Sequence, residues 1–99
     1  MAGPEASIER LVCRRALDEL GVGNFKWGVD GWPDRVFLIP GGRPLMIEFK
    51  APGGELSPRQ VFRIECLRTW GYQVEVHDDV NRAFQAIKDR LTHIGKTKI

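Results

Sequence analysis

Residues 31–60 read GWPDRVFLIPGGRPLMIEFKAPGGELSPRQ, and this stretch decides the fold. Two apolar runs, residues 36–39 and 45–47, flank residues 40–44, whose prolines and glycines indicate a turn. Strands of this length joined by such a turn form a β-hairpin. The sequence therefore predicts a hydrophobic hairpin around which the other elements are arranged.

The open end of this hairpin brings charged residues together. Because a hairpin places the start of its first strand beside the end of its second, we expect Asp34 and Glu48 to meet, with Lys50 on the face of Glu48. Two carboxylates held close together repel unless a cation lies between them. Oxygen ligands suit Mg²⁺ or Mn²⁺ better than zinc, and a nearby lysine can stabilise negative charge on a phosphate. The pattern is typical of metal-assisted phosphodiester hydrolysis. The residues alone leave a second interpretation open, in which Asp34 is a turn residue and the other two are exposed strand residues.

The motifs at these positions resemble those of a nuclease family. Pro33-Asp34 followed by Glu48-x-Lys50 resembles the PD-(D/E)xK nuclease superfamily. The longer strings Gly-x-Pro-Asp-Arg, from residue 31, and Glu-Phe-Lys-Ala-Pro-Gly-Gly-x-Leu-Ser-x-x-Gln, from residue 48, are similar to the VRR-NUC (virus-type replication-repair nuclease) family. The resemblance covers nearly the whole chain, so we expect residues 1–99 to form one domain, with a core of about 5–91 and a flexible basic tail at 92–99.

The resemblance implies a Mg²⁺- or Mn²⁺-dependent DNA endonuclease with an acidic metal site. Asp34 and Glu48 would bind the metal ion, with the backbone carbonyl of Phe49 as a further ligand. Glu9, on the first predicted helix, would complete the acidic set directly or through water. The residues alone favour the other interpretation, an exposed helix acid near the positive end of the helix dipole.

Two more residues receive catalytic roles from the resemblance. Lys50 would orient or help deprotonate the attacking water, and Gln60 would position water or the scissile phosphate. By local pattern alone, Gln60 completes a capping box with Ser57 at the start of a helix over residues 58–70. The two roles of Gln60 are compatible, because the first turn of that helix follows the strand that carries Lys50.

Residues around this site are candidates for contact with DNA. Arg59 and Arg63 share one helix face and would form a small positive patch, or would simply be solvated arginines. Gly53 and Gly54 would let backbone amides approach a phosphate, or would only connect a strand to a helix. Arg35 would either brace the site or contact phosphate. The roles of Trp32 and His77 stay open.

The remaining elements follow from hydrophobic periodicity. Helices are expected over residues 5–20, 58–70 and from about 78 to 91, and further strands over 25–29 and 72–77. Phe25, Trp27 and Val29 would share one face of their strand, and Ser7 could cap the first helix. The order predicts an α/β fold with αβββαβα order and a central mixed sheet flanked by helices. It also resembles the minimal fold of the nuclease superfamily.

Composition sets wider limits on the protein. The chain has 99 residues, 42% of them hydrophobic, and a net charge of +2, which does not by itself indicate nucleic acid. No secretory signal, lipidation motif or membrane-spanning run is visible. We therefore expect no membrane partner and a cytoplasmic location in a bacterium or a phage-infected host cell. Cys13 and Cys66 fall in helical apolar patterns and are expected to be buried thiols in a reducing compartment.

The expected substrate is DNA recognised by shape. A domain of this size offers little surface for reading bases, and no helix-turn-helix or zinc-finger motif is visible. One active site cuts one strand, so a homodimer is expected to cut two strands of a branch. Stand-alone members of the family resemble resolvases of four-way (Holliday) junctions, which favours that substrate. The alternatives are a catalytically silent DNA-binding or assembly module, a flap or nicking nuclease, and an RNA-directed phosphodiesterase.

Overall fold

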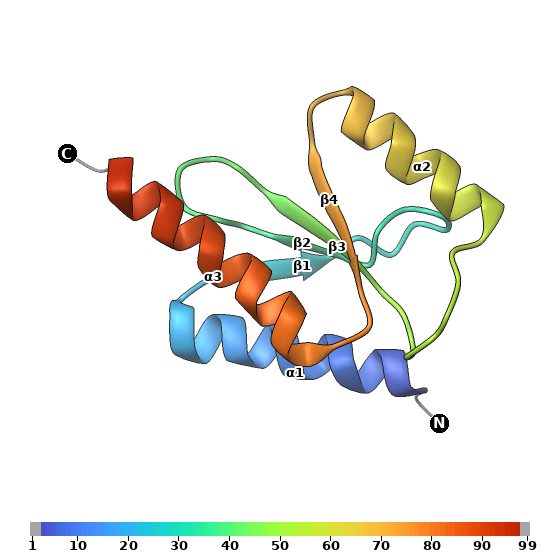
Figure 1. Ribbon diagram of the computed structural model, residues 1–99, viewed down its shortest axis with the longest axis horizontal. Helices are drawn as coiled ribbons and strands as arrows, with labels where there is room; N and C mark the ends of the chain where they lie inside the picture. Colours follow the sequence, from blue (N-terminus) through green and yellow to red (C-terminus); the bar gives the residue numbers. More distant parts are fainter. Residues whose placement is uncertain (1–2, 98–99) are drawn as a thin grey trace.

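The computed structural model describes residues 3–97, with side chains described for residues 3–91. In chain order the elements are α1 (Pro4–Leu20), β1 (Asn24–Lys26), β2 (Arg35–Phe37), β3 (Leu45–Phe49), α2 (Pro58–Thr69), β4 (Gln73–His77) and α3 (Val80–Thr97). This order confirms the predicted α/β class with αβββαβα order (Figure 1). None of the helices in residues 3–97 combines the length and the apolar character needed to cross a membrane.

The four strands form one mixed sheet in the order β1-β2-β3-β4. β2 is antiparallel to both β1 and β3, and β4 runs parallel to β3. Because parallel neighbours need a crossover connection, the chain passes through α2 between β3 and β4. All five residues of β3 are buried, so this central strand is the fixed frame from which the residues after it project.

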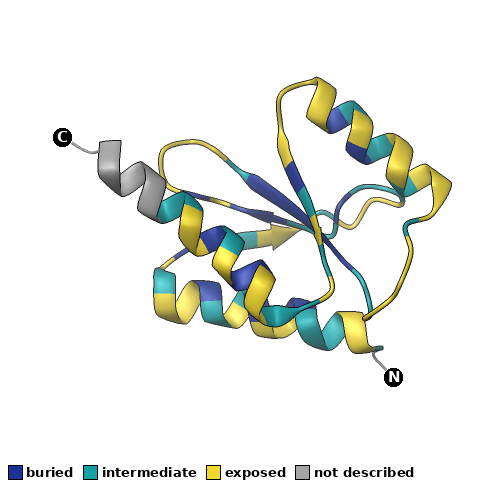
Figure 2. Cartoon of the chain, in the orientation of Figure 1, coloured by how far each residue is buried: buried dark blue, intermediate teal, exposed yellow. Residues whose placement is uncertain are grey.

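The sheet lies between two helical layers (Figure 1). Side chains alternate along β3: Leu45, Ile47 and Phe49 join a core cluster with residues of α1 and α3, while Met46 joins a cluster with residues of α2. Figure 2 shows the buried positions gathered on the strands and on the helix surfaces that cover them. By the same alternation, Glu48 shares the α2 face with Met46, which places a carboxylate beside an apolar layer.

The start of α2 confirms the predicted capping box. The Ser57 hydroxyl accepts a hydrogen bond from the Gln60 amide N–H at 3.2 Å, and Gln60 Oε1 accepts one from the Ser57 N–H at 2.9 Å. Pro58 occupies the first helical position, where its missing N–H costs nothing. These two bonds fix the first turn of α2, and with it the side chain of Gln60.

Replacing Ser57 by alanine is expected to lower the free energy of unfolding by about 1 kcal/mol, because the Gln60 N–H loses its cap. Urea unfolding monitored by circular dichroism measures the change. Ser7→Ala is the matched control, since α1 is capped at Gly3 without a side-chain bond and Ser7 lies inside the helix. Equal losses in the two variants would show that the cap does not stabilise α2.

Two expectations for the helix ends are wrong. Ser7 does not cap α1, which begins at Pro4. The last helix does not end at Leu91, because α3 continues to Thr97 and a single glycine at position 95 does not end it. Residues 1, 2, 98 and 99 lie outside the described part of the chain, so the predicted tail is described only as far as Thr97.

The expected strand at residues 25–29 is also wrong in its extent. β1 ends at Lys26, and the chain then turns at Gly28, whose φ is +70°. Phe25 and Val29 are 48% and 49% exposed, whereas Trp27 is half-buried against the α2 cluster. β1 is an edge strand that pairs only with β2 in this sheet. An alternating pattern predicts burial only where a helix covers the strand, and at this edge Phe25 and Val29 stay exposed.

Exposure also differs from expectation on α2 and β4. The apolar periodicity of residues 58–70 and the alternation of residues 72–77 predict six inward positions: Val61, Ile64, Leu67, Tyr72, Val74 and Val76. Ile64, Leu67 and Val74 are buried as predicted, whereas Val61, Tyr72 and Val76 are 39%, 47% and 36% exposed. β2 spans Arg35–Phe37, one residue earlier than the predicted run. That shift matters for function, because it places Asp34 immediately before the strand.

Candidate active site

The two predicted acids face each other at the end of the central hairpin. Arg35 pairs with Ile47 in the strand register, so the preceding residue, Asp34, lies across from Glu48. Asp34 Oδ2 accepts a hydrogen bond from the Phe49 N–H at 2.8 Å, which holds this carboxylate against β3. Glu48 is only 3% exposed. The hairpin thus fixes both carboxylates by main-chain geometry, as the sequence predicted.

Both carboxyl groups are electrostatically strained. Burial, and then the neighbouring Asp34, raise the pKa of Glu48 to about 7, although Lys50 opposes the shift. Burial also raises the pKa of Asp34 above its usual range, against the stabilising Phe49 N–H. Two close carboxylates that resist ionisation are relieved when a cation lies between them. The electrostatics therefore favour a positive ion at this end of the sheet.

Lys50 and Gln60 complete the α2 side of the site. Lys50 Nζ donates a hydrogen bond to Gln60 Oε1 at 2.8 Å and lies 3.7 Å from Glu48 Oε2. Gln60 Nε2 donates to the same Glu48 oxygen at 2.9 Å. Because Gln60 Oε1 also accepts the Ser57 N–H, the capping box orients the amide that links Glu48 to Lys50. Gln60 is therefore both a capping residue and part of the site.

Glu9 reaches the same end of the sheet from α1, in the other helical layer. It is 8% exposed and forms an ion pair with Arg35 at 2.5 Å, and Arg35 also donates to Asn24 Oδ1 at 3.3 Å. Of the two roles left open for Arg35, the structure shows that it braces Glu9. Arg35 thereby ties the first helix to the sheet beside the acidic pair.

A hollow of about 330 Å³ joins the residues of both layers. Its lining residues are Glu5, Ala6, Glu9, Asp34, Glu48, Phe49, Lys50, Ala51, Gly54 and Glu55. The three predicted acids and Lys50 therefore face a single open space, wide enough to admit a phosphate group. The structure brings together the predicted catalytic residues, with Gln60 one layer behind Lys50 and Glu48.

The donor set of this hollow fits a hard divalent cation. Asp34 and Glu48 supply oxygen donors, and a cation between them would oppose the effect of burial that raises the pKa of both groups and the effect of the Asp34 charge that further raises the pKa of Glu48. Among the described residues, no group of three or more His, Cys, Asp or Glu side chains is close enough to hold a metal ion. Glu9, paired with Arg35, is thus not placed as a direct third ligand, which leaves its predicted action through water.

Arg59 and Arg63 hold the loop that leads into Asp34. Arg59 pairs with Asp30 at 2.6 Å, and the Arg63 guanidinium lies 4.8 Å from the centre of the Trp32 ring. Gly31 has a φ of +83°, and a Cβ there would come within 2.6 Å of the Arg59 side chain, so this approach requires glycine. The two arginines support the loop, and their contact with DNA stays a prediction.

The contacts of Gly53 and Gly54 favour the interpretation in which these glycines only connect a strand to a helix. The Gly54 N–H donates to the Ala51 carbonyl at 2.8 Å, and the Gly53 N–H points to Asp78 Oδ2 at 3.5 Å. Both amides therefore have partners within the chain. Residues 51–54 form a turn that connects β3 to α2, and a phosphate would have to displace these partners to reach the amides.

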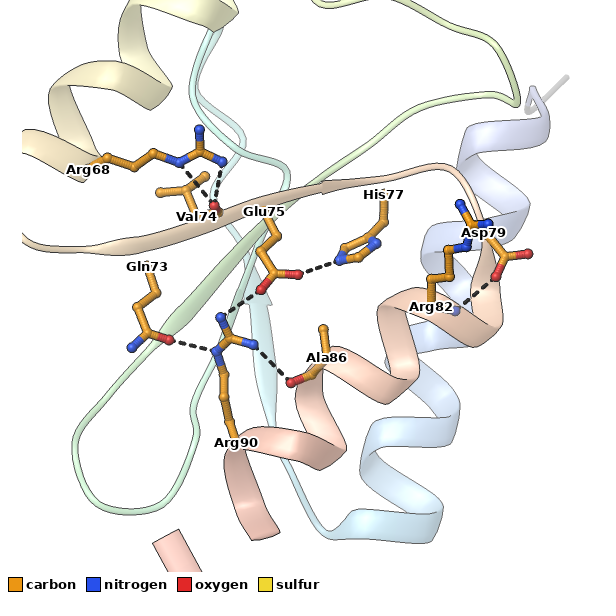
Figure 3. A network of polar contacts seen from close by, with 9 residues as sticks. All are labelled: Arg68, Gln73, Val74, Glu75, His77, Asp79, Arg82, Ala86 and Arg90. Carbon is orange, nitrogen blue, oxygen red and sulfur yellow. Dashed lines mark hydrogen bonds and ion pairs between the residues drawn. The ribbon is translucent and has the colours of Figure 1, made fainter. Parts of the chain in front are cut away.

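His77 belongs to a separate polar network between β4 and α3 (Figure 3). Its Nε2 lies 2.6 Å from Glu75 Oε1, and Arg90 donates to the other Glu75 oxygen at 2.6 Å. Although burial raises the pKa of Glu75, the hydrogen bonds from His77 and Arg90 bring it below its usual value. The network fastens β4 to α3. The His77 carbonyl also accepts the Lys50 N–H at 2.9 Å, which steadies the strand end that carries Lys50.

The sequence analysis missed one lysine at the margin of the site. Lys26 ends β1 and lines one hollow together with Asp34 and Gln60, and a second together with Glu9 and Arg35. Its charge is among the influences that lower the pKa of Asp34, whose largest influence is burial, which raises it. Consecutive antiparallel pairing of β1, β2 and β3 is the signal that could have found it, because that pairing places the end of β1 beside the start of β2.

Comparison with known proteins agrees with the geometry. A sequence model of the VRR-NUC domain matches residues 5–79. A solved structure titled "VRR_NUC domain" is similar with a TM-score of 0.75 at 24% identity, over 88% of this chain and 97% of that one. Another, "VRR_NUC domain protein", has a TM-score of 0.74 at 21% identity, over 93% and 91% of the two chains. No match was found among curated proteins. At these identities the structural likeness shows the fold, and the domain match covers most of the chain.

Proposed function

The chain belongs to the VRR-NUC domain family, a family of PD-(D/E)xK-type nucleases, and we propose that it is a metal-dependent endonuclease that hydrolyses phosphodiester bonds in DNA selected by shape. The observation that carries this proposal is the arrangement of Asp34, Glu48 and Lys50 around one open hollow. A buried carboxylate, Glu48, beside a half-buried one, Asp34, is costly to keep unless the pair binds a positive charge. A module that only binds DNA gains nothing from acids facing a phosphate.

In this proposal Asp34 and Glu48 hold a Mg²⁺ or Mn²⁺ ion, with the Phe49 carbonyl as a further ligand. When bound, such an ion supplies Lewis-acid activation of the phosphodiester and lowers the pKa of a coordinated water. The Phe49 N–H keeps the Asp34 carboxylate in a fixed orientation. Glu9 adds negative charge from the other layer and acts through water, while Arg35 keeps its side chain in place.

Lys50 is the cation of the site. Its ammonium lies beside Glu48 at the edge of the hollow, where it can offset the negative charge that grows on the phosphate oxygens and orient the attacking water. Gln60 acts as a positioning residue, because its amide oxygen and nitrogen are engaged by Lys50 and Glu48 respectively. Because both ends of the Gln60 amide are already bonded to site residues, Gln60 is better suited to orienting Lys50 and Glu48 than to making the direct contact with substrate that the resemblance implies.

The proposed substrate is branched DNA, and the proposed active form is a homodimer. The hollow is lined by five carboxyl groups and by Lys50, a set suited to a metal ion and a phosphate and not to base edges, which supports recognition of shape over base sequence. One site cleaves one strand, so two copies related by a twofold axis would make paired cuts in a four-way junction. Light scattering would test the dimer. A mass near the 11.2 kDa of one chain at micromolar concentration would contradict it.

The function is tested by cleavage of end-labelled substrates with Mg²⁺, Mn²⁺ or EDTA. The substrates are a four-way junction, a flap, a linear duplex, a single strand and an RNA of the same shape. Metal-dependent cutting, with symmetric cuts favoured in the junction, is the expected result. Lys50→Met is expected to lower the rate about a hundredfold at saturating enzyme, because charge stabilisation at the phosphate is lost.

Arg43→Ala is a suitable control, because Arg43 is an exposed basic residue in the hairpin turn at the opposite end of the sheet. Its rate should match that of the wild type. If the wild type binds these nucleic acids but cuts none of them with either metal, the chain is a binding module and the catalytic proposal fails. If the RNA is cut faster than DNA of the same shape, RNA and not DNA is the substrate.

A further inference from the structure

Three hollows meet at the end of the sheet around the acidic residues. The first contains Asp34, Glu48 and Lys50, and is the proposed reaction site. The second, of about 330 Å³, shares Asp34 with it and extends along the loop of residues 28–33. The third, of about 260 Å³, shares Glu9 with the first. Lys26 lines both the second and the third hollow, so its side chain lies where these two meet, next to the reaction site.

Lys26 differs from three other basic residues around the site, Lys50, Arg35 and Arg59, each of which is engaged by another side chain. Lys50 is bonded to Gln60, Arg35 to Glu9, and Arg59 to Asp30. Within the described part of the chain, the exposed ammonium of Lys26 forms no ion pair or hydrogen bond. It has therefore retained its full capacity to bind an external anion.

We propose that Lys26 binds the backbone phosphate next to the scissile one, and that the hollow between Lys26 and Trp32 receives the nucleotide that joins these two phosphates. This inference rests on the proposed function, because it assumes that the scissile phosphate lies between Asp34 and Lys50.

The geometry of the second hollow supports this path for the DNA strand. The hollow begins at Asp34, beside the reaction site, and its walls are Lys26 on one side and the loop with Gly28, Val29 and Trp32 on the other. Lys26 offers a cation for a phosphate, and Val29 and Trp32 offer apolar surface for the sugar and the flat base of a nucleotide. Asp30 also lines this hollow, and its carboxylate is paired with Arg59. Arg10 also lines the third hollow, but it lines neither of the two hollows that contain Asp34.

The experiment measures single-turnover cleavage of the DNA that the wild type cuts best, over a range of enzyme and salt concentrations. A series of substrates carries one neutral methylphosphonate in place of one phosphodiester, moved stepwise along the cleaved strand on both sides of the cut. Lys26→Ala and Lys26→Gln are compared with Arg43→Ala, which removes the same charge at the far end of the sheet. Lys26→Arg tests rescue by a retained charge.

Lys26→Ala is expected to raise the half-saturating enzyme concentration about tenfold, since one charge-assisted contact is lost. The maximal rate should be nearly unchanged, because Lys26 does not touch the reacting atoms. The dependence of log affinity on log salt should become shallower by about one. A methylphosphonate at one linkage adjoining the cut should raise the half-saturating concentration of the wild type to the same extent. It should leave the half-saturating concentration of Lys26→Ala unchanged, whereas Arg43→Ala should respond like the wild type.

Each other outcome contradicts the inference in a recognisable way. If wild type and Lys26→Ala show the same methylphosphonate profile while the wild type cuts normally, Lys26 binds no backbone phosphate and the proposed function stands. Equal losses in Lys26→Ala and Arg43→Ala would indicate a general charge effect and would also overturn the inference. Failure of the wild type to cut any nucleic acid would instead refute the proposed function, and this inference with it. Thermal unfolding of the three Lys26 variants should match that of the wild type, because the side chain is exposed.

Discussion

Replacing Asp34 by asparagine is expected to lower the cleavage rate on the order of a thousandfold, while making the metal-free protein more stable to heat. The activity falls because a metal-binding carboxylate is lost. The stability rises because burial, and to a smaller extent the charge of Glu9, raise the pKa of Asp34, so its charge destabilises the fold. Asparagine keeps an oxygen that can accept the Phe49 N–H, so the local structure is retained.

Single-turnover cleavage and thermal unfolding in EDTA measure the two effects. Asp18→Asn is the matched control, because Asp18 is an exposed residue of α1 that lines none of the three hollows around the site. That control should cut at nearly the wild-type rate. An Asp34→Asn protein that is folded and cuts as fast as the wild type would remove Asp34 from the reaction. A variant that is both inactive and less stable would indicate a structural role instead.

Wild-type protein in EDTA is expected to lose stability as the pH rises from about 4.5 to about 7. Glu48 has a pKa of about 7 in the folded protein against 4.5 as its ordinary value, so the folded state binds more protons across this window. The penalty is absent below pH 4.5, grows through the window and is fully present above pH 7. It amounts to roughly 3 kcal/mol at pH 8. Asp34, whose pKa is also raised, acts in the same direction.

Glu48→Gln is expected to remove this penalty, so the variant should exceed the wild type in stability by up to about 3 kcal/mol at pH 8 and should equal it at pH 4. Urea unfolding at pH 4, 6 and 8 measures the difference. Mg²⁺ at pH 8 should stabilise the wild type and leave Glu48→Gln unchanged, because only the wild type has both carboxylates. Glu65→Gln, an exposed change on α2, is the control. A Glu48→Gln protein no more stable than wild type at pH 8 would contradict the proposed strain.

The sequence predicted those parts of the site that depend on local rules. Hairpin pairing is set by the turn and by strand alternation, so these two features suffice to place Asp34 and Glu48 opposite each other. The capping box at Ser57 and Gln60 depends only on residues three positions apart. These are short-range relations, and the structure confirms each of them.

The remainder depends on contacts between distant elements, which a pattern does not contain. The role of Arg35 is open in the sequence because its partner, Glu9, comes from a helix in another part of the chain. The exposure of Phe25 and Val29 follows from the position of β1 at the sheet edge, which alternation does not reveal. Lys26 was not predicted as a site residue for a related reason. An exposed strand lysine gives no signal in the sequence, and only the pairing of β1 with β2 places it beside the acidic residues.

The placement of Glu9 and Gln60 in opposite helical layers has a consequence for the newly synthesised chain. Asp34, Glu48 and Lys50 come from one hairpin and could form early, since their pairing is local. Glu9 reaches them only after α1 has docked on one face, and Gln60 only after α2 has docked on the other. A chain that ends before residue 58 therefore carries the acidic residues and Lys50 without Gln60, and a chain that begins after residue 20 carries them without Glu9. The proposed cutting activity is accordingly expected only once both helical layers have docked on the sheet.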